Sequence, residues 1–314
     1  MRVLLTGAAG QLGQILRQQC PPGVELIASS RSGGEGLIPL DLADPAACRA
    51  AIAVHRPDWV LNAGAYTAVD RAEVDAAEAW AVNAGAPRAF AEALAERSSP
   101  VAGGLLQLST DFVFSGRQGS PYRPEQPCDP LGVYGASKAA AEQVVLARLG
   151  AEGNGAARGL ILRTSWLMGP VGRNFAQTML RLHREHAGSD QPLRVVADQV
   201  GCPTSTLSLA AACWRVLQRC CDPSVPSPRP RILHWSDAGA ASWYDVAVAV
   251  GELAVELGLL RQGASVQPIT TADYPTPAQR PSYSLLDCSQ TRRFLDLQPH
   301  HWRQALRQWL SLLR

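Results

Sequence analysis

The sequence lacks the features that mark membrane, nucleic-acid-binding and zinc-binding proteins. No apolar run reaches the ~20 residues that a transmembrane helix needs, and a predicted strand begins at Arg2, which leaves no room for a signal peptide. The net charge is +2 without any basic run, so no electrostatic footprint for nucleic acid or an acidic membrane exists. The eight cysteines form no C-x-x-C motif, and none pairs with histidine at zinc spacing. We therefore expect a cytoplasmic protein with reduced thiols and no structural metal.

Charged residues are also scarce, at 18% of the chain, whereas apolar residues make up 46%. That apolar content is enough for a complete hydrophobic core. The length of 314 residues exceeds one small domain and fits one large or two modest domains.

A strand, a glycine-rich turn and a helix are predicted in direct succession at the N-terminus. The strand covers Arg2–Thr6, and a helical run covers Gln14–Cys20. The residues of the turn that we assign to cofactor binding are Gly7, Gly10, Gln11, Leu12 and Gly13. Glycine lets the backbone approach a pyrophosphate, and the helix N-terminus points N–H donors at it. The turn therefore predicts dinucleotide binding, the alternative being a tight turn that merely packs.

The residues after the second predicted strand, Val24–Ala28, select the cofactor in such a fold. An acidic residue there would bind the ribose 2′-hydroxyl, whereas an arginine would accept a 2′-phosphate. Ser30 and Arg31 occupy this place without a carboxylate, which favours NADPH and leaves NADH open. The alternative is that Arg31 is a solvated loop residue. Asp41 and Leu42 close the next short strand, where an adenine amino group could bind.

Small residues follow the next predicted strand, Asp58–Asn62, and would let the cofactor lie over the strand ends. They are Ala63, Gly64 and Ala65. The long Ala-rich stretch Glu73–Arg97 is predicted to be helical, with Asn83 capping a local turn or facing solvent.

This alternation of strands and mostly helical connections predicts an α/β protein with a doubly wound parallel sheet, the Rossmann arrangement. We expect residues 1–169 to form the dinucleotide-binding domain and residues 170–314 to form mainly a smaller α/β substrate-binding domain. The segment around 197–235 is expected to return to the first domain.

Three polar residues point to acid–base chemistry. Tyr134 and Lys138 are four residues apart and would share one face of a helix. One lysine charge at ~4 Å, at an effective dielectric of ~20, favours the phenolate by about 4 kcal/mol, which corresponds to about three pKa units. Thr110 lies at the carboxyl end of a predicted strand, where it would face the ligand crevice. The alternative is an ordinary surface pair.

Taken together, these motifs resemble the extended short-chain dehydrogenase/reductase family and, more narrowly, the dTDP-4-dehydrorhamnose reductases. The similarity covers nearly the whole chain, and the strings S-T-D-F-V-F and D-Q-x-G-x-P-T are its most specific parts. The matching segments are Thr6–Gly13, Asn62–Ala65, Tyr66–Asp70, Ser109–Phe114, Tyr134–Lys138, Arg163–Trp166, Asn174–Phe175, Asp198–Thr204 and Arg280–Cys288.

The resemblance implies NAD(P)H-dependent reduction of the 4-keto group of dTDP-4-dehydro-L-rhamnose. By analogy, Thr110, Tyr134 and Lys138 would be catalytic, and Tyr134 and Lys138 would also contact the cofactor. The implied substrate-binding residues are Val69, Thr110, Asp111, Trp166, Asn174 and Arg280. Two alternatives are another nucleotide-sugar epimerase or dehydratase, and a non-catalytic regulatory subunit of a methionine adenosyltransferase.

One position departs from the family pattern. Some members carry a glutamate two residues after the third glycine, where it supports a metal-linked dimer, and here that position is Ile15. Because isoleucine cannot ligate a cation, we expect no metal bridge and a monomer or a weak homodimer. The expected partner is the nucleotide-sugar substrate, without nucleic acid or membrane.

Overall fold

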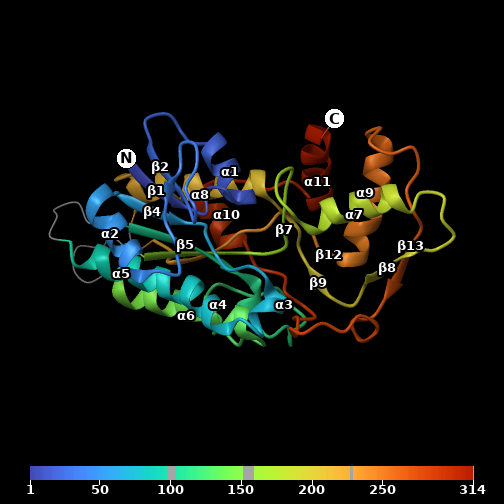
Figure 1. The fold of residues 1–314 in the computed structure, drawn as a ribbon, viewed down its shortest axis with the longest axis horizontal. Coiled ribbons are helices and arrows are strands. Elements are labelled where there is room, and N and C mark those ends of the chain that lie inside the picture. Colours follow the sequence, from blue (N-terminus) through green and yellow to red (C-terminus); the bar gives the residue numbers. More distant parts are fainter. Residues whose placement is uncertain (98–103, 151–158, 227–228, 314) are drawn as a thin grey trace.

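The computed structural model describes residues 1–97, 104–150, 159–226 and 229–313. Figure 1 shows a large sheet with helices on both faces and, beside it, a smaller group of helices and short strands that includes α7, α9 and α11. Among the described residues, no helix has the length and apolar character needed to cross a membrane.

The large sheet has seven strands, all paired in parallel, in the order β11-β6-β5-β4-β1-β2-β3. The predicted doubly wound sheet is therefore confirmed. Its order reverses between β1 and β4, and ligands bind in open α/β sheets at the carboxyl ends of strands that flank such a point. The strands are β1 (Arg2–Thr6), β2 (Glu25–Ser30), β3 (Ile38–Pro39), β4 (Trp59–Asn62), β5 (Gly104–Thr110), β6 (Gly159–Thr164) and β11 (Ile232–His234).

Helices cover both faces of this sheet, and for this reason its strands are nearly continuous apolar runs. Val3 and Leu5 pack in the core under one helical layer, whereas Leu4, which points the other way, packs in the core under the other. The first layer consists of α1 (Gln11–Gln18), α8 (Thr206–Cys221) and α10 (Ser289–Leu295). The second consists of α2 (Pro45–His55), α5 (Ala86–Ala95) and α6 (Val133–Arg148).

The smaller group has a hydrophobic core of its own. Its helices are α7 (Phe175–Glu185), α9 (Trp243–Glu256) and α11 (Trp302–Leu310). Three two-stranded sheets accompany them: β7 (Leu167–Met168) with β10 (Thr204–Ser205), β8 (Leu193–Val196) with β13 (Val266–Ile269), and β9 (Val200–Gly201) with β12 (Ala241–Ser242). Between these pieces the chain crosses back to the large sheet, where α8 packs in the same core as α1 and β11 pairs with β6. Three short 3-10 turns are also present, η2 (Asp111–Val113), η3 (Thr271–Asp273) and η4 (Ser311–Leu313).

The predicted helical stretch over Glu73–Arg97 is largely confirmed, but it is not one regular α-helix. After α3 (Val69–Ala72), the chain forms α4 (Ala76–Trp80), a π-helical turn η1 (Ala81–Gly85) and α5 with no break between the last three. Asn83 lies in the π turn and is buried, not exposed to solvent. Its amide accepts a hydrogen bond from the backbone N–H of Tyr66 at 2.9 Å and donates to the Ser137 hydroxyl at 3.1 Å. The wider turn is what lets this amide reach inward and join the loop after β4 to α6.

The glycine turn between β1 and α1 is compact because side chains are absent there. Gly7 has φ +65°, and a Cβ on it would lie 2.6 Å from the Cα of Gly64. A Cβ on Gly13 would lie 2.1 Å from the carbonyl oxygen of Gly7. The helix begins at Gln11 and not at the predicted Gln14, so Gln11 and Leu12 belong to its first turn.

We expect Gly13→Ala to lower the free energy of unfolding by about 1–3 kcal/mol, because the added methyl group must displace backbone atoms. The matched control is Gly119→Ala, where a Cβ would meet no described atom within 4 Å. The measurement is the urea midpoint of each variant. Equal midpoints for the two variants would contradict the steric account.

Candidate active site

A cleft of about 710 Å³ lies at the carboxyl ends of β1, β4, β5 and β6. The large sheet and the smaller group both contribute to its walls. The predicted site residues that line it are Gly7, Gly10, Gln11, Leu12, Gly13, Ala63, Gly64, Ala65, Val69, Thr110, Asp111, Tyr134, Lys138, Trp166, Asn174 and Arg280. Ser30, Arg31, Asp41 and Leu42 lie outside this lining. Residues from distant parts of the sequence thus meet at one place.

The first turn of α1 fits an anionic group such as a diphosphate. The N–H groups of a helix's first turn have no acceptor within the helix, and Gly10 at the N-cap has no side chain to offer one. The buried side-chain oxygen of Gln11 has no hydrogen-bond partner among the described residues, but as an acceptor it cannot bind the anion itself. Donors without acceptors at a helix N-terminus, next to a turn made of glycine, form an anion site.

The predicted cofactor selector, Arg31, is paired with carboxylates. Its side chain is 70% exposed and forms ion pairs with Asp41 at 3.2 Å and Glu78 at 3.1 Å. Exposed pairs contribute only ~0–1 kcal/mol, so an incoming phosphate could compete for the guanidinium. Ser30 donates its hydroxyl to the Gly33 carbonyl at 3.0 Å, and the Leu42 side chain packs on Gly64.

Thr110, Tyr134 and Lys138 come together at the carboxyl end of β5. The Thr110 hydroxyl hydrogen-bonds the Tyr134 phenol. Its oxygen also contacts Asp111 at 3.1 Å and accepts the backbone N–H of Phe112 at 3.1 Å. Phe112 packs edge-on against the Tyr134 ring, with the ring centroids 5.8 Å apart. Thr110 and Tyr134 are thus in contact, and Lys138 lines the same cleft.

The electrostatics of this group differ from the expectation. Burial raises the pKa of Tyr134 to about 12, although the Thr110 hydrogen bond opposes the shift. Burial also lowers the pKa of Lys138 to about 8, against the attraction of Glu142. The expected lowering of the phenol pKa by Lys138 is therefore wrong for this structure. The Lys138 ammonium instead donates to the Leu108 carbonyl at 2.6 Å.

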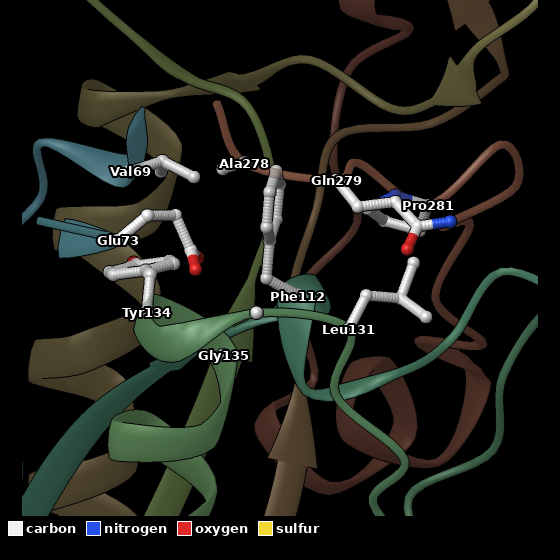
Figure 2. Close-up of a pocket in the computed structure, with 10 residues that line it drawn as sticks. Val69, Glu73, Phe112, Leu131, Tyr134, Gly135, Ala278, Gln279 and Pro281 are labelled. Atoms are coloured by element: carbon white, nitrogen blue, oxygen red, sulfur yellow. The ribbon is translucent and has the colours of Figure 1, made fainter. Parts of the chain in front are cut away.

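Behind Tyr134 lies a small cavity of about 10 Å³, shown in Figure 2. Glu73 and Tyr134 stand on one side of Phe112 there, with Leu131 and Gln279 on the other. The Glu73 carboxylate accepts the backbone N–H of Val133 at 2.9 Å, in the first turn of α6. Because Gly132 at the N-cap lacks a side chain, Glu73 serves as the cap. The sequence analysis missed this role, since the two residues are far apart in the chain.

The wall opposite the sheet is aromatic. Trp166 stacks on Trp243 with ring centroids 3.6 Å apart, and Phe175 packs against Trp243 at 4.7 Å. Trp166 has φ +45°, a backbone conformation uncommon for a bulky residue. Trp243 lies more than 70 residues later in the chain, so nothing in the sequence linked it to Trp166.

Two of the remaining predicted substrate residues, Asn174 and Arg280, already have partners, whereas one buried carboxylate oxygen of Asp111 has none among the described residues. Asn174 caps α7 by accepting the Gln177 N–H at 3.0 Å and donates to the Gly169 carbonyl at 2.9 Å. Its amide therefore holds the cleft wall in place. Arg280 forms an ion pair with Asp70 at 2.7 Å, which ties the loop before it to α3. Burial raises the pKa of Asp111 to about 6, with hydrogen bonds from Ser284 and Thr110 opposing the rise.

Within the part of the chain that the structure describes, no group of three or more histidine, cysteine, aspartate or glutamate side chains could hold a metal ion. Ile15 is 2% exposed and packs in the core between α1 and the sheet.

Comparison with known proteins identifies close relatives. The model of the family described as the RmlD substrate binding domain matches residues 1–314. A probable dTDP-4,6-dihydroxy-2-methyloxan-3-one 4-ketoreductase of Streptomyces antibioticus is 41% identical, over 98% of this chain and 94% of its own. A dTDP-4-dehydrorhamnose reductase of Sinorhizobium fredii is 37% identical, over 100% of this chain and 98% of its own.

Solved structures agree. The crystal structure of a dTDP-4-dehydrorhamnose reductase of Clostridium acetobutylicum superposes with a TM-score of 0.83 and 32% identity, covering 100% of this chain and 99% of its own. That of Bacillus anthracis, in complex with NADP, has a TM-score of 0.81 and 29% identity, with 98% of each chain covered. With a family model matched from end to end and relatives above 30% identity over the full length, the chain belongs to the RmlD family, that of the dTDP-4-dehydrorhamnose reductases.

Proposed function

We propose that the protein reduces the 4-keto group of dTDP-4-dehydro-L-rhamnose to give dTDP-L-rhamnose, with NADPH as the hydride donor. The convergence of Thr110, Tyr134 and Lys138 in one cleft with the glycine turn carries this proposal. Membership of the family and the NADP complex of the Bacillus anthracis relative support it.

The glycine turn and the first turn of α1 would hold the cofactor's pyrophosphate, with Ala63, Gly64 and Ala65 beneath the nicotinamide half. Arg31 would release its carboxylates to bind the 2′-phosphate, with Asp41 and Leu42 beside the adenine. When bound, the reduced nicotinamide supplies a hydride to the carbonyl carbon of the sugar. The protein's own side chains act on the oxygen.

Tyr134 gives its hydroxyl proton to the sugar oxygen as the carbon gains the hydride, so one hydride and one proton convert the ketone into an alcohol. A phenol with a pKa of about 12 is protonated near neutral pH, so the proton to be transferred is present. The Thr110 hydroxyl orients the same oxygen. The Lys138 ammonium, which donates to the Leu108 carbonyl in this structure, would bind the nicotinamide ribose.

The nucleotide sugar would lie between the sheet and the aromatic wall. Trp166 packs the sugar ring, and Val69 and Asp111 lie beside it. Arg280, which holds Asp70 in this structure, supplies positive charge for the sugar pyrophosphate. Asn174 acts by keeping α7 and the cleft wall in place.

A second candidate substrate is another dTDP-linked 4-keto sugar, favoured by the 41% identity to the Streptomyces antibioticus ketoreductase. A dehydratase is disfavoured because Phe112, beside Asp111, cannot serve as the second acid–base group that dehydration needs. An epimerase would return the hydride to its substrate, so net oxidation of NADPH distinguishes it from a reductase. A purely regulatory role is disfavoured by the complete set of Thr110, Tyr134 and Lys138. Incubation with each keto sugar and each reduced nicotinamide, followed by loss of nicotinamide absorbance, separates these functions.

We expect Tyr134→Phe to lower turnover ~10²-fold or more while leaving NADPH affinity close to that of the unaltered protein, because only the proton donor is lost. The matched control is Tyr274→Phe, since Tyr274 is 61% exposed and does not line the cleft. Steady-state kinetics and cofactor titration by fluorescence provide the measurement. Normal turnover in Tyr134→Phe would exclude this residue as the proton donor.

We expect Arg31→Ala to reduce the preference for NADPH over NADH about tenfold, because the 2′-phosphate loses one charge-assisted contact worth ~1.5–3 kcal/mol in part-solvated surroundings. Arg181→Ala is the control, since Arg181 forms a comparable exposed ion pair with Glu185 on α7. The measurement is kcat/KM for the two cofactors. An unchanged ratio dismisses Arg31 as the selector.

We further propose a monomer or a weak homodimer that does not depend on a divalent cation, because the buried apolar side chain of Ile15 occupies the position of the glutamate found in some relatives. Light scattering with and without Mg²⁺ measures the mass directly. We expect the same mass in both conditions, and a dimer that forms only with Mg²⁺ would refute this.

A further inference from the structure

A buried ion pair lies directly behind the cleft. Glu142 of α6 and Arg163 of β6 have side chains only 3% and 2% exposed. The guanidinium contacts the carboxylate three times, from Nη2 to Oε2 at 2.6 Å and from Nε to Oε1 and Oε2 at 2.9 and 3.1 Å. Removing two charges from water costs about as much as their attraction returns, so such pairs are weak evidence for stability. The position of this pair therefore calls for another explanation.

The pair is joined to the catalytic strand through Ser109. The Ser109 hydroxyl donates to Glu142 Oε1 at 2.5 Å, and one residue earlier the Leu108 carbonyl accepts from Lys138 at 2.6 Å. Consecutive residues of β5 are thus bonded to two residues one turn apart on α6. Thr110 is the next residue of that strand, and Tyr134 is one turn earlier on that helix. The hydrogen bonds from Ser109 to Glu142 and from Lys138 to Leu108 therefore set the position of the Thr110 hydroxyl relative to the Tyr134 hydroxyl.

The far side of Arg163 is also held. Its Nη1 donates to the Pro124 carbonyl at 3.1 Å and contacts His234 Nε2 at 3.2 Å, and its Nη2 contacts the Cys128 sulfur at 3.4 Å. A buried network whose members are all bonded is rigid. Glu142 therefore cannot swing away from Ser109 without breaking several bonds at once.

The charges around Lys138 give Glu142 a second effect. Tyr134 and Glu142 lie on its own helix, Asp111 follows β5, and Arg163 of β6 and His234 of β11 lie behind Glu142. The negative charge of Glu142 favours the protonated form of Lys138 and so raises the Lys138 pKa. Burial acts in the opposite direction.

We propose that Glu142 is a positioning residue of the reductase, which joins β5 to α6 so that Thr110 meets Tyr134 and which places a negative charge one helical turn from Lys138. This inference rests on the proposed function. It goes beyond that function by assigning a task to a side chain outside the cleft lining.

The test uses two sets of variants. In Glu142→Leu/Arg163→Met the whole pair is replaced by apolar side chains, an exchange that is often neutral or stabilising. Its matched control is Arg181→Met/Glu185→Leu, which removes an exposed pair on α7. Ser109→Ala keeps the buried pair and removes only its link to β5. Glu142→Asp serves as the conservative rescue, because it retains the charge on a shorter side chain.

We expect the buried double variant to keep its urea midpoint yet to lose about 10²-fold in kcat, because the reacting groups are misplaced. The pH at which half of the activity is lost on the alkaline side should be lower in the double variant, because Lys138 without Glu142 releases its proton more readily. Ser109→Ala should lower kcat without changing the pH at which activity is lost on the alkaline side. Glu142→Asp should retain part of the activity that the double variant loses. Unchanged kcat in both Ser109→Ala and the double variant would reduce the pair to packing and overturn the proposal.

A second readout needs no substrate. Lys138 is the only lysine in the chain, so an amine-reactive label measured by peptide mass spectrometry reports on this side chain, with the N-terminal amine as internal reference. We expect the midpoint of labelling against pH to fall in the buried double variant and to stay constant in the control. An unchanged midpoint overturns the electrostatic part of the proposal. Inactivity of the unaltered protein toward both keto sugars would instead count against the proposed function, so the two failures are distinguishable.

Discussion

The parallel pairing of β1 with β4 is the constraint on which the rest of the molecule depends. It places the end of β1, and with it the glycine turn, against Gly64 at the end of β4, where no Cβ would fit. The strand order reverses there, so the connecting helices diverge to opposite faces and leave the crevice open. The smaller group then covers that crevice with an aromatic wall. The cleft is therefore a consequence of sheet topology, and its floor needs no special side chains.

Burial governs the chemistry of this cleft more than any single charge does. The phenol of Tyr134 and the ammonium of Lys138 both shift toward their neutral forms, because each loses contact with water. A neutral phenol is the form that donates a proton, whereas the ammonium needs support to stay charged. Glu142 offers that support from the same helix, one turn away. Burial thus keeps the Tyr134 phenol neutral, whereas the negative charge of Glu142 on the same helix helps the Lys138 ammonium to stay protonated.

Much of the site could be predicted because its elements are local in sequence. Tyr134 and Lys138 share a helix face through a four-residue spacing, and Thr110 ends a strand whose carboxyl edge must face the crevice. What could not be predicted are contacts between distant segments. Asn83 is buried because a π turn redirects it, Glu73 caps α6 across 60 residues, and Trp243 stacks on Trp166. The periodicity of apolar residues and the amino-acid composition do not indicate which distant residues contact one another.

The amino-acid sequence by itself determined the order of strands and helices, the glycine turn and the choice of the three side chains proposed to react, because spacing and apolar periodicity act within a few residues. The tertiary structure alone decided the ionisation of those side chains and the partners of Arg31, Asn174 and Arg280. It also decided the place of the Glu142–Arg163 pair. These properties depend on distance from water and on which distant atoms are brought within hydrogen-bond reach, and packing sets both.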